Sequence, residues 1–204
     1  MIVVVDYGMG NLRSVEKAFS FLGHRVTVSR EPAAVAEATG IVLPGVGSFG
    51  DAVNELQVRG LLPALKEAIR AEKPFLGICL GYQLLCGSSE ESPGVNGLGV
   101  LPGRVLRFPP RVKVPHMGWN DISMAANHPV LAGVEEGSFF YFVHSFYVVR
   151  EREEDVLTTT DYGLPFASGA AFGSVVAFQF HPEKSSQPGL RILDNFAHWC
   201  AKEG

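Results

Sequence analysis

One stretch of the sequence passes without a linker from a strand pattern into a helix pattern: Phe75-Leu76-Gly77-Ile78-Cys79-Leu80-Gly81-Tyr82-Gln83-Leu84-Leu85. The apolar run over residues 75–78 is typical of a strand buried in a sheet, and residues 79–85 read as the helix that follows it. A strand that leads directly into a helix is the repeating unit of folds with a parallel sheet. This stretch therefore predicts an α/β protein.

The rest of the N-terminal half repeats this alternation. Strands are predicted at Ile2–Val5, 25–28 and 40–43. A helix with Asn11 as its N-cap ends at Gly23, because these residue types favour the two ends of a helix. Further helices are predicted over 32–38, 51–58 and 61–72. Elements of these lengths predict parallel strands joined by right-handed crossovers.

The second half has a different character. Between residues 105 and 180 the apolar runs are short, strand-like and separated by Pro and Gly, as at 139–143, 156–159 and 175–180. The last helix has an apolar stripe of Leu190, Leu193, Ala197 and Cys200. We expect one domain over residues 1–204 with three layers: a mostly parallel central sheet flanked by helices, and an added antiparallel β section.

The composition excludes several classes of protein. Of the 204 residues, 47% are hydrophobic and 19% are charged, which excludes disorder. The net charge of −4 is too mild to indicate a nucleic-acid or membrane partner. The three cysteines indicate neither a disulfide framework nor a zinc site, and we find no signal peptide or transmembrane span. We therefore expect a cytoplasmic protein.

The first candidate for catalysis is Cys79, which lies between Gly77 and Gly81 where the predicted strand meets the predicted helix. This is the spacing of a nucleophile elbow, with Cys in the place of Ser. The glycines permit a sharp turn, the helix N-terminus favours the thiolate, and the backbone N–H of Leu80 points to where an oxyanion would form. The alternative is a buried structural cysteine, which is the better interpretation for Cys86 and Cys200.

A thiol nucleophile needs a base, and the base needs an acceptor that orients it. Among six histidines, His181 alone has a carboxylate two residues away, in His181-Pro182-Glu183. It also follows an apolar strand and therefore lies at a sheet end. A surface turn with an incidental Glu is the alternative, and Cys79 makes the catalytic interpretation the better one.

A glycine-rich loop, Pro44-Gly45-Val46-Gly47-Ser48-Phe49-Gly50, follows a strand and precedes a helix. It matches the G-x-G-x-x-G pattern of dinucleotide-binding proteins, so a nucleotide-binding protein is a competing hypothesis. That fold needs an acid at the end of the next strand, where this chain has Cys79. The loop instead offers a backbone N–H, near Val46 or Gly47, as a second oxyanion donor.

The motifs around Cys79 and His181 resemble those of a known family, the triad glutamine amidotransferases. Gly77-Ile78-Cys79-Leu80-Gly81-Tyr82-Gln83 is similar to the nucleophile motif of the family, and His181-Pro182-Glu183 to its base-and-orienter motif. The resemblance covers essentially the whole chain. It implies a glutaminase that converts L-glutamine to glutamate and ammonia with Cys79, His181 and Glu183, and without a cofactor or metal.

The resemblance also implies how glutamine binds. His144-Ser145-Phe146-Tyr147 is similar to the loop of the family that holds the glutamine carboxylate, commonly His-Ser-Tyr. Phe146 departs from that pattern, but the loop acts through backbone N–H groups. Substrate contacts are therefore expected from Gln83, Gly47 and the backbone of Ser145, Phe146 and Tyr147.

Four further segments narrow the resemblance to the branch of the family that serves histidine biosynthesis: Asp6-Tyr7-Gly8-Met9-Gly10-Asn11-Leu12, Pro44–Phe49, Pro115-His116-Met117-Gly118-Trp119-Asn120 and Lys184-Ser185. This implies a heterodimer in which ammonia passes to a (β/α)8 cyclase subunit. Asn11, Trp119 and Lys184 are candidates for the face toward that partner. Their alternative roles are a helix cap, a core aromatic and a solvated lysine.

Three functional hypotheses therefore follow, in order of preference. The first is a glutaminase subunit, and the second is a related Cys-His hydrolase or peptidase, which would not act on free glutamine. The third is a nucleotide-binding protein that uses Gly45–Gly50, which an NAD titration would reveal.

Overall fold

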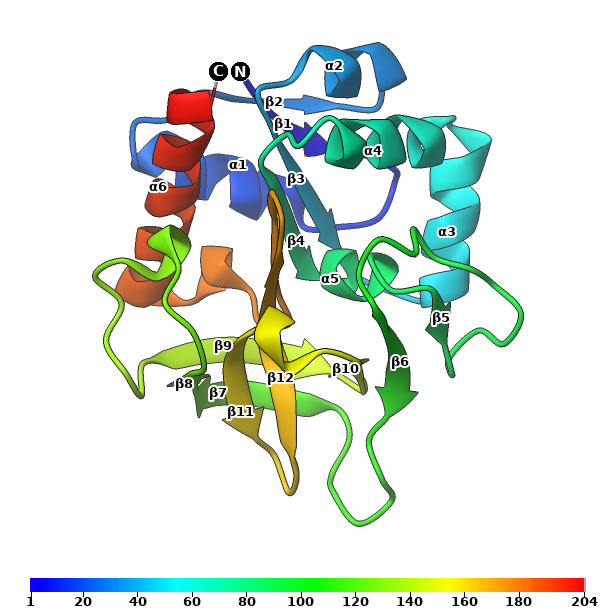
Figure 1. Ribbon diagram of the computed structural model, residues 1–204, viewed down its shortest axis with the longest axis vertical. Coiled ribbons are helices and arrows are strands. Elements are labelled where there is room, and N and C mark those ends of the chain that lie inside the picture. Colours follow the sequence, from blue (N-terminus) through cyan, green and yellow to red (C-terminus); the bar gives the residue numbers. More distant parts are fainter. Residues whose placement is uncertain (204) are drawn as a thin grey trace.

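The computed structural model describes residues 1–203, so residue 204 of the predicted domain lies outside the described residues. Its centre is an eight-stranded sheet (Figure 1). The strand order is β2 (Val26–Ser29), β1 (Ile2–Val5), β3 (Gly40–Gly45), β4 (Phe75–Cys79), β13 (Val175–Phe178), β12 (Pro165–Phe172), β11 (Val156–Asp161) and β8 (Ser123–Met124). The first five strands are parallel and the last three continue the sheet in antiparallel fashion.

Helices cover both faces of the parallel part because its strands are apolar on both sides. In β1, Val3 and Val5 belong to one core cluster, and Ile2 and Val4 belong to another. The first cluster lies under α2 (Pro32–Glu37), α3 (Phe49–Val58), α4 (Leu61–Arg70) and α5 (Leu80–Leu84). The second lies under α1 (Leu12–Phe21) and α6 (Ser186–Glu203). This arrangement gives the three predicted layers.

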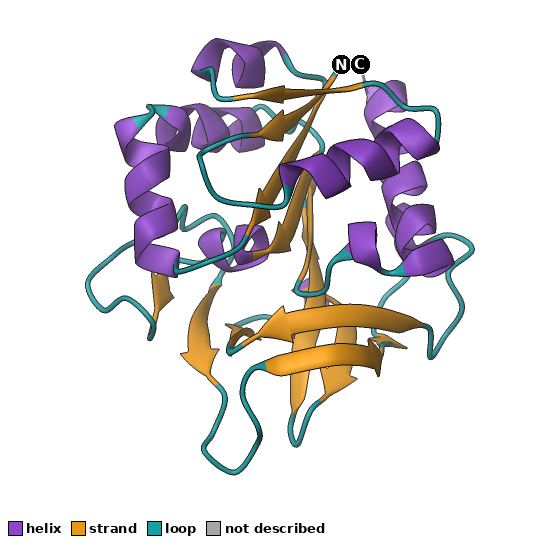
Figure 2. Ribbon diagram, turned by 180° about the vertical axis from the view of Figure 1, so that it is seen from behind, coloured by secondary structure: helices purple, strands orange, loops and turns teal. Residues whose placement is uncertain are grey.

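Two small sheets complete the second half of the chain. One has the order β10 (Phe146–Arg150), β6 (Gly103–Arg107), β5 (Ser88–Ser89), and the other pairs β7 (His116–Asp121) with β9 (Phe139–His144). Figures 1 and 2 show β7 and β9 crossing the carboxyl ends of the parallel strands, opposite the end where both termini lie. The β7–β9 pair therefore lies over the sheet edge where α/β proteins bind ligands.

The predicted α/β architecture with an added antiparallel section is confirmed, and the single domain stays a prediction. Several local predictions differ from the structure. Asn11 makes no side-chain capping bond, since its backbone (φ −88°, ψ 61°) is not in the extended conformation of an N-cap residue. The helix after Cys79 ends at Leu84, and the strand predicted over 175–180 ends at Phe178.

Across residues 1–203, every helix is too short or too polar to cross a membrane.

Candidate active site

The sheet topology brings three distant segments of the chain to one edge. β4 lies between β3 and β13, and all three strands are parallel. Gly45 at the end of β3 is in register with Cys79 at the end of β4, and Phe178 of β13 is in register with Ile78. The glycine loop, the cysteine and the segment that holds His181 therefore emerge side by side.

Cys79 forms a sharp turn between β4 and α5. Its φ of 53° and ψ of −107° are unusual for a residue other than glycine. Gly77 and Gly81 allow the turn because the strand and helix touch there: a Cβ on Gly77 would lie 3.1 Å from the Gly81 carbonyl, and one on Gly81 would collide with the Leu43 carbonyl oxygen. The predicted role of the two glycines in this turn is thus visible in the geometry.

A cavity of about 330 Å³ opens beside Cys79. That volume is at the lower end of the range for small-molecule sites, roughly 300–1,000 Å³. Its lining includes most of the residues predicted for oxyanion and substrate binding: Val46, Gly47, Leu80, Gln83, Ser145 and Phe146. Tyr147 is not in this lining. Its ring stacks on Phe108 at 4.7 Å and lines a separate cavity.

His181 and Glu183 form a buried pair beside Cys79. His181 Nδ1 lies 2.8 Å from Glu183 Oε1, and the two side chains are 2% and 1% exposed. Burial alone would lower the pKa of His181, but the charges of the Cys79 sulfur and the Glu183 carboxylate raise it to about 10. Among residues 1–203, Nε2 of His181 has no hydrogen-bond partner. A charged imidazole with a free nitrogen beside a charged sulfur is suited to proton transfer.

The backbone around His181 is held by the β9 strand. The His181 N–H donates to the Tyr141 carbonyl at 2.9 Å, and the Ser185 hydroxyl donates to the His181 carbonyl at 2.6 Å. The same hydroxyl accepts from the Tyr141 N–H at 2.9 Å. These contacts fix the base relative to the sheet edge.

The sequence assigned no role to three polar residues at the site: Gln179, His144 and Glu91. The Gln179 amide lies 3.6 Å from the Cys79 sulfur, and its position directly before Phe180-His181 was the available signal. His144 lines the cavity, as does Glu91, whose carboxylate accepts from the Phe49 N–H at 2.7 Å. Nothing in the local sequence distinguishes Glu91 from a surface acid.

The other two cysteines are buried outside this cavity. Burial raises the pKa of Cys86 and that of Cys200 to about 12 in each case. A thiol that stays protonated is a poor nucleophile, so both residues fit the core-packing role.

The three residues predicted for a partner face occupy the same end of the molecule. Trp119 of β7 is 52% exposed and packs edge-on against Tyr141, so it is not a core aromatic. Lys184 is exposed, with its Nζ 5.8 Å from the centre of the Tyr141 ring. Asn11 lies in the loop that follows β1, and its side chain does not cap α1.

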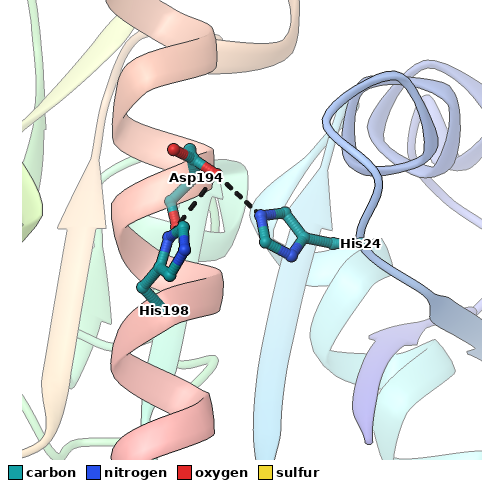
Figure 3. A group of neighbouring side chains, drawn as sticks. All are labelled: His24, Asp194 and His198. Atoms are coloured by element: carbon teal, nitrogen blue, oxygen red, sulfur yellow. Dashed lines mark hydrogen bonds and ion pairs between the residues drawn. The ribbon is translucent and has the colours of Figure 1, made fainter.

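In the described part of the chain, one further group of possible metal ligands comes together: His24, Asp194 and His198 (Figure 3). His24 Nε2 contacts Asp194 Oδ1 at 2.7 Å, which joins the turn after α1 to α6. His198 is 64% exposed at its side chain, and its Nδ1 is directed to the Asp194 carbonyl at 2.9 Å. A hydrogen bond between two elements accounts for this cluster.

Comparison with known proteins assigns the family. The model of the family described as class-I glutamine amidotransferase matches residues 3–199. The imidazole glycerol phosphate synthase subunit HisH of Moorella thermoacetica is 50% identical over 203 residues, covering 100% of this chain and 97% of that protein. The HisH subunit of Aquifex aeolicus is 51% identical over 201 residues, covering 98% and 97%.

Solved structures share the fold at low sequence identity. A PurLQS structure from Thermotoga maritima superposes with a TM-score of 0.78 and 20% identity, covering 97% of each chain. A crystal structure of a glutamine amidotransferase gives a TM-score of 0.76 and 22% identity, covering 97% of this chain and 100% of the other. With the full-length relatives and the matching family model, the chain belongs to the class I glutamine amidotransferases.

Proposed function

We propose that the chain is the glutaminase subunit of an imidazole glycerol phosphate synthase, and that it supplies ammonia from L-glutamine to a cyclase subunit. The observation that carries this proposal is the arrangement of Cys79 beside a substrate-sized cavity with the buried His181–Glu183 pair next to it. The names of the full-length relatives support the choice of synthase.

In the first half of the reaction, the Cys79 thiolate attacks the side-chain amide carbon of glutamine. The carbonyl π electrons move to oxygen, and the N–H groups of Leu80 and of the loop at Val46 or Gly47 stabilise that oxyanion. When the oxyanion collapses, the C–N bond breaks and protonated His181 gives its proton to the departing nitrogen. The products are ammonia and a γ-glutamyl thioester on Cys79.

In the second half, neutral His181 removes a proton from water, which attacks the thioester carbon. The C–S bond breaks, glutamate leaves, and the Cys79 thiolate and His181 imidazolium are restored. Glu183 remains a carboxylate throughout: it orients the ring through Nδ1 and stabilises its positive charge.

The cavity also offers partners for the α-amino acid end of glutamine. We assign the α-carboxylate to the backbone N–H groups of Ser145 to Tyr147. The α-ammonium is assigned to Glu91 and the Gln83 side-chain oxygen, because Glu91 brings a carboxylate into the lining. These polar contacts at both ends of the substrate would select glutamine over amides without an amino acid end.

The cyclase subunit is proposed to dock on the face that carries Trp119 and Lys184. Ammonia released into water would be protonated and lost, so a glutaminase benefits from a partner placed over its cavity. The β7–β9 pair lies at the same edge of the sheet as the cavity. The cytoplasmic location stays a prediction from the sequence.

The first test is substitution of the nucleophile. Cys79→Ala is expected to abolish glutamate release, by at least about 10⁴-fold, because no other side chain provides the nucleophile. Glutamate is measured by a coupled assay in the complex with the cyclase, and circular dichroism checks the fold. Cys200→Ala is the matched control, since it changes another buried cysteine outside the cavity and should retain activity.

Labelling with a glutamine-like diazoketone identifies both the nucleophile and the substrate. We expect one label at Cys79, and excess glutamine should suppress it. Label at Cys86 or Cys200 would contradict the mechanism, as would undiminished turnover by Cys79→Ala.

A further inference from the structure

A continuous run of hydrogen bonds leads from the surface of β7 to the catalytic sulfur. Asn120 Nδ2 lies 3.3 Å from His116 Nε2, and His116 Nδ1 lies 2.9 Å from His144 Nε2. His144 Nδ1 lies 2.8 Å from the Phe146 carbonyl oxygen. The two rings meet because His116 and His144 stand opposite each other in the antiparallel register of β7 and β9.

The run continues on the other side of the same carbonyl. Gln83 Nε2 donates to the Phe146 oxygen at 3.0 Å and to Gln179 Oε1 at 3.1 Å. Gln179 Nε2 in turn lies 3.6 Å from Cys79 Sγ. His116, His144, Gln83 and Gln179 are all buried, and Gln179 is fully inaccessible.

The chemistry of these groups allows only one direction of donation. The Phe146 carbonyl accepts, so His144 donates from Nδ1, and the other nitrogen of a neutral ring must accept. Burial keeps both rings neutral, since it lowers the pKa of His144 to about 3 and that of His116 to about 4. His116 therefore donates from Nδ1 and accepts from Asn120 at Nε2.

The same logic fixes the two glutamines. Both hydrogens of Gln83 Nε2 are used, which leaves its oxygen as the atom available to the cavity that Gln83 lines. Gln179 accepts with its oxygen and must present its amide hydrogens to the Cys79 sulfur. A flip of the Gln83 amide would place its oxygen against the Phe146 and Gln179 oxygens, and a flip of the Gln179 amide would place its NH2 group against that of Gln83.

We propose that His116, His144 and Gln179 are positioning residues of the glutaminase, and that their hydrogen-bond chain holds the Gln83 oxygen toward the substrate and supplies a donor to the Cys79 sulfur. The inference rests on the proposed function, because it assigns the substrate to this cavity. The same run of hydrogen bonds also holds the Phe146 carbonyl, and with it the backbone of the loop assigned to the glutamine carboxylate.

Two substitutions of His116 separate positioning from packing. The ring stacks on Tyr162 at 3.9 Å and on Phe142 at 4.7 Å. His116→Phe retains an aromatic ring for stacking but has no donor for His144. His116→Asn loses the ring, but its amide places a donor where Nδ1 was. If His116 acts only through packing, the Phe variant should keep its function and the Asn variant should lose it. If His116 acts through its hydrogen bond, the Asn variant should keep its function and the Phe variant should lose it.

The assay is glutamate release by the complex with the cyclase subunit. We expect His116→Phe to raise the KM for glutamine about tenfold with a smaller change in kcat, as for loss of one hydrogen bond that orients a binding group. His116→Asn should stay within about twofold of the wild-type KM although it is less stable. Loss of glutamine binding in the Asn variant but not in the Phe variant, or unchanged KM in both, would overturn the proposal.

A second measurement tests the contact with sulfur. The rate of Cys79 alkylation by iodoacetamide, measured against pH, reports the pKa of this thiol in its surroundings, which include His181 and Tyr7. Gln179→Leu removes the donor, so we expect the alkylation profile to move to higher pH and kcat to fall about tenfold. A profile that coincides with wild type would refute the role of Gln179.

Thr158→Val is the matched control. Thr158 is buried on β11, and its hydroxyl contacts that of Ser168 at 3.0 Å. Neither side chain takes part in the run of hydrogen bonds from Asn120 to Cys79. This variant loses a buried hydrogen bond and should keep the wild-type KM and alkylation profile. If the wild-type complex releases no glutamate, the proposed function fails, while the alkylation profiles still decide whether Gln179 acts on Cys79.

Discussion

Cys79 holds a backbone conformation that few residues other than glycine adopt, with φ at 53°. Such a residue costs on the order of 1–3 kcal/mol and persists only where its surroundings hold it in place. Here β4 and α5 hold it, because Gly77 and Gly81 let them approach to van der Waals contact. The strain places the sulfur at the sheet edge, where the cavity and His181 lie.

Gly81 should therefore be intolerant of even one methyl group. Gly81→Ala would drive a Cβ into the Leu43 carbonyl oxygen, and we expect it to lower the free energy of unfolding by about 3 kcal/mol, as overpacking does. Urea denaturation measures this. Gly87→Ala is the control, since a Cβ there meets nothing within 4 Å, and equal urea midpoints for the two variants would contradict the prediction.

At the residue scale, the sequence motifs identify the nucleophile and the base, but not the groups that surround them. Cys79 and His181 each stand in a short, recognisable pattern next to a predicted strand end. Gln179 looks like an interruption of an apolar run, and Glu91 looks like a surface acid. The position of Gln179 beside Cys79 and that of Glu91 at the cavity depend on contacts between distant segments, which local sequence does not encode.

The β7–β9 pair lines one side of the cavity through Val143 and His144 of β9. It contains two histidines that face each other, His116 and His144. His116 and His144 are buried at 3% and 6% exposure, and they contact each other at 2.9 Å. Buried imidazoles without a carboxylate partner stay neutral, so protons bind to them only when the structure opens.

The free energy of unfolding should therefore begin to decrease at a pH above that at which the carboxylates of the protein become protonated. The pKa values of His116 and His144 are lowered to about 4 and about 3, below the ordinary 6.5. Between pH 6.5 and 4 the unfolded chain binds protons that the folded chain does not, so stability is present above pH 6.5 and decreases as the pH falls. The slope is about 1.4 kcal/mol per histidine and pH unit.

The measurement is the urea midpoint at pH 6, 5.5 and 5, below the range in which the raised pKa of His181 changes the stability. His116→Phe should show a shallower decrease than wild type because one buried neutral histidine is gone. Equal slopes for wild type and His116→Phe would show that the His116 ring is not held neutral.

The elements of the N-terminal half could be predicted because each is a local pattern. Ile2–Val5 was predicted with its observed bounds, and the helix over 61–72 ends two residues early. In the second half of the chain, strands could be predicted, but not the order in which they pair in the sheets. The pairing of β7 with β9 and the insertion of β13 beside β4 are long-range contacts. The sequence contains many strand-like segments that could have paired instead, so these partners could not be predicted.

At the scale of the whole molecule, β7 and β9 lie at one end, and the start of β1 and the end of α6 lie at the other (Figure 1). The cavity, which is lined by Val143 and His144 of β9, is at the β7–β9 end. Met117, Trp119 and Phe139 are exposed apolar side chains on β7 and β9, at 59%, 52% and 56%. Exposed apolar side chains on one strand pair support the proposal that the partner subunit docks at this face.

Charge reversal at this face should weaken association with the cyclase. Lys184→Glu removes a cation that lies over the Tyr141 ring, and we expect the Kd to rise about tenfold, with most of the change at low salt. A titration with the purified cyclase measures this. Lys202→Glu makes the same change near the opposite end of the molecule, and equal affinity of the two variants would remove Lys184 from the interface.

The position of β13 between β4 and β12 also governs when the enzyme can first work during its own synthesis. A ribosome delivers Cys79 early, but β4 keeps an unpaired edge until residues 175–178 have left the exit tunnel. His181 follows only a few residues later. A nascent or truncated chain therefore lacks the base, cannot release ammonia prematurely, and exposes a sheet edge that invites aggregation or removal by quality control.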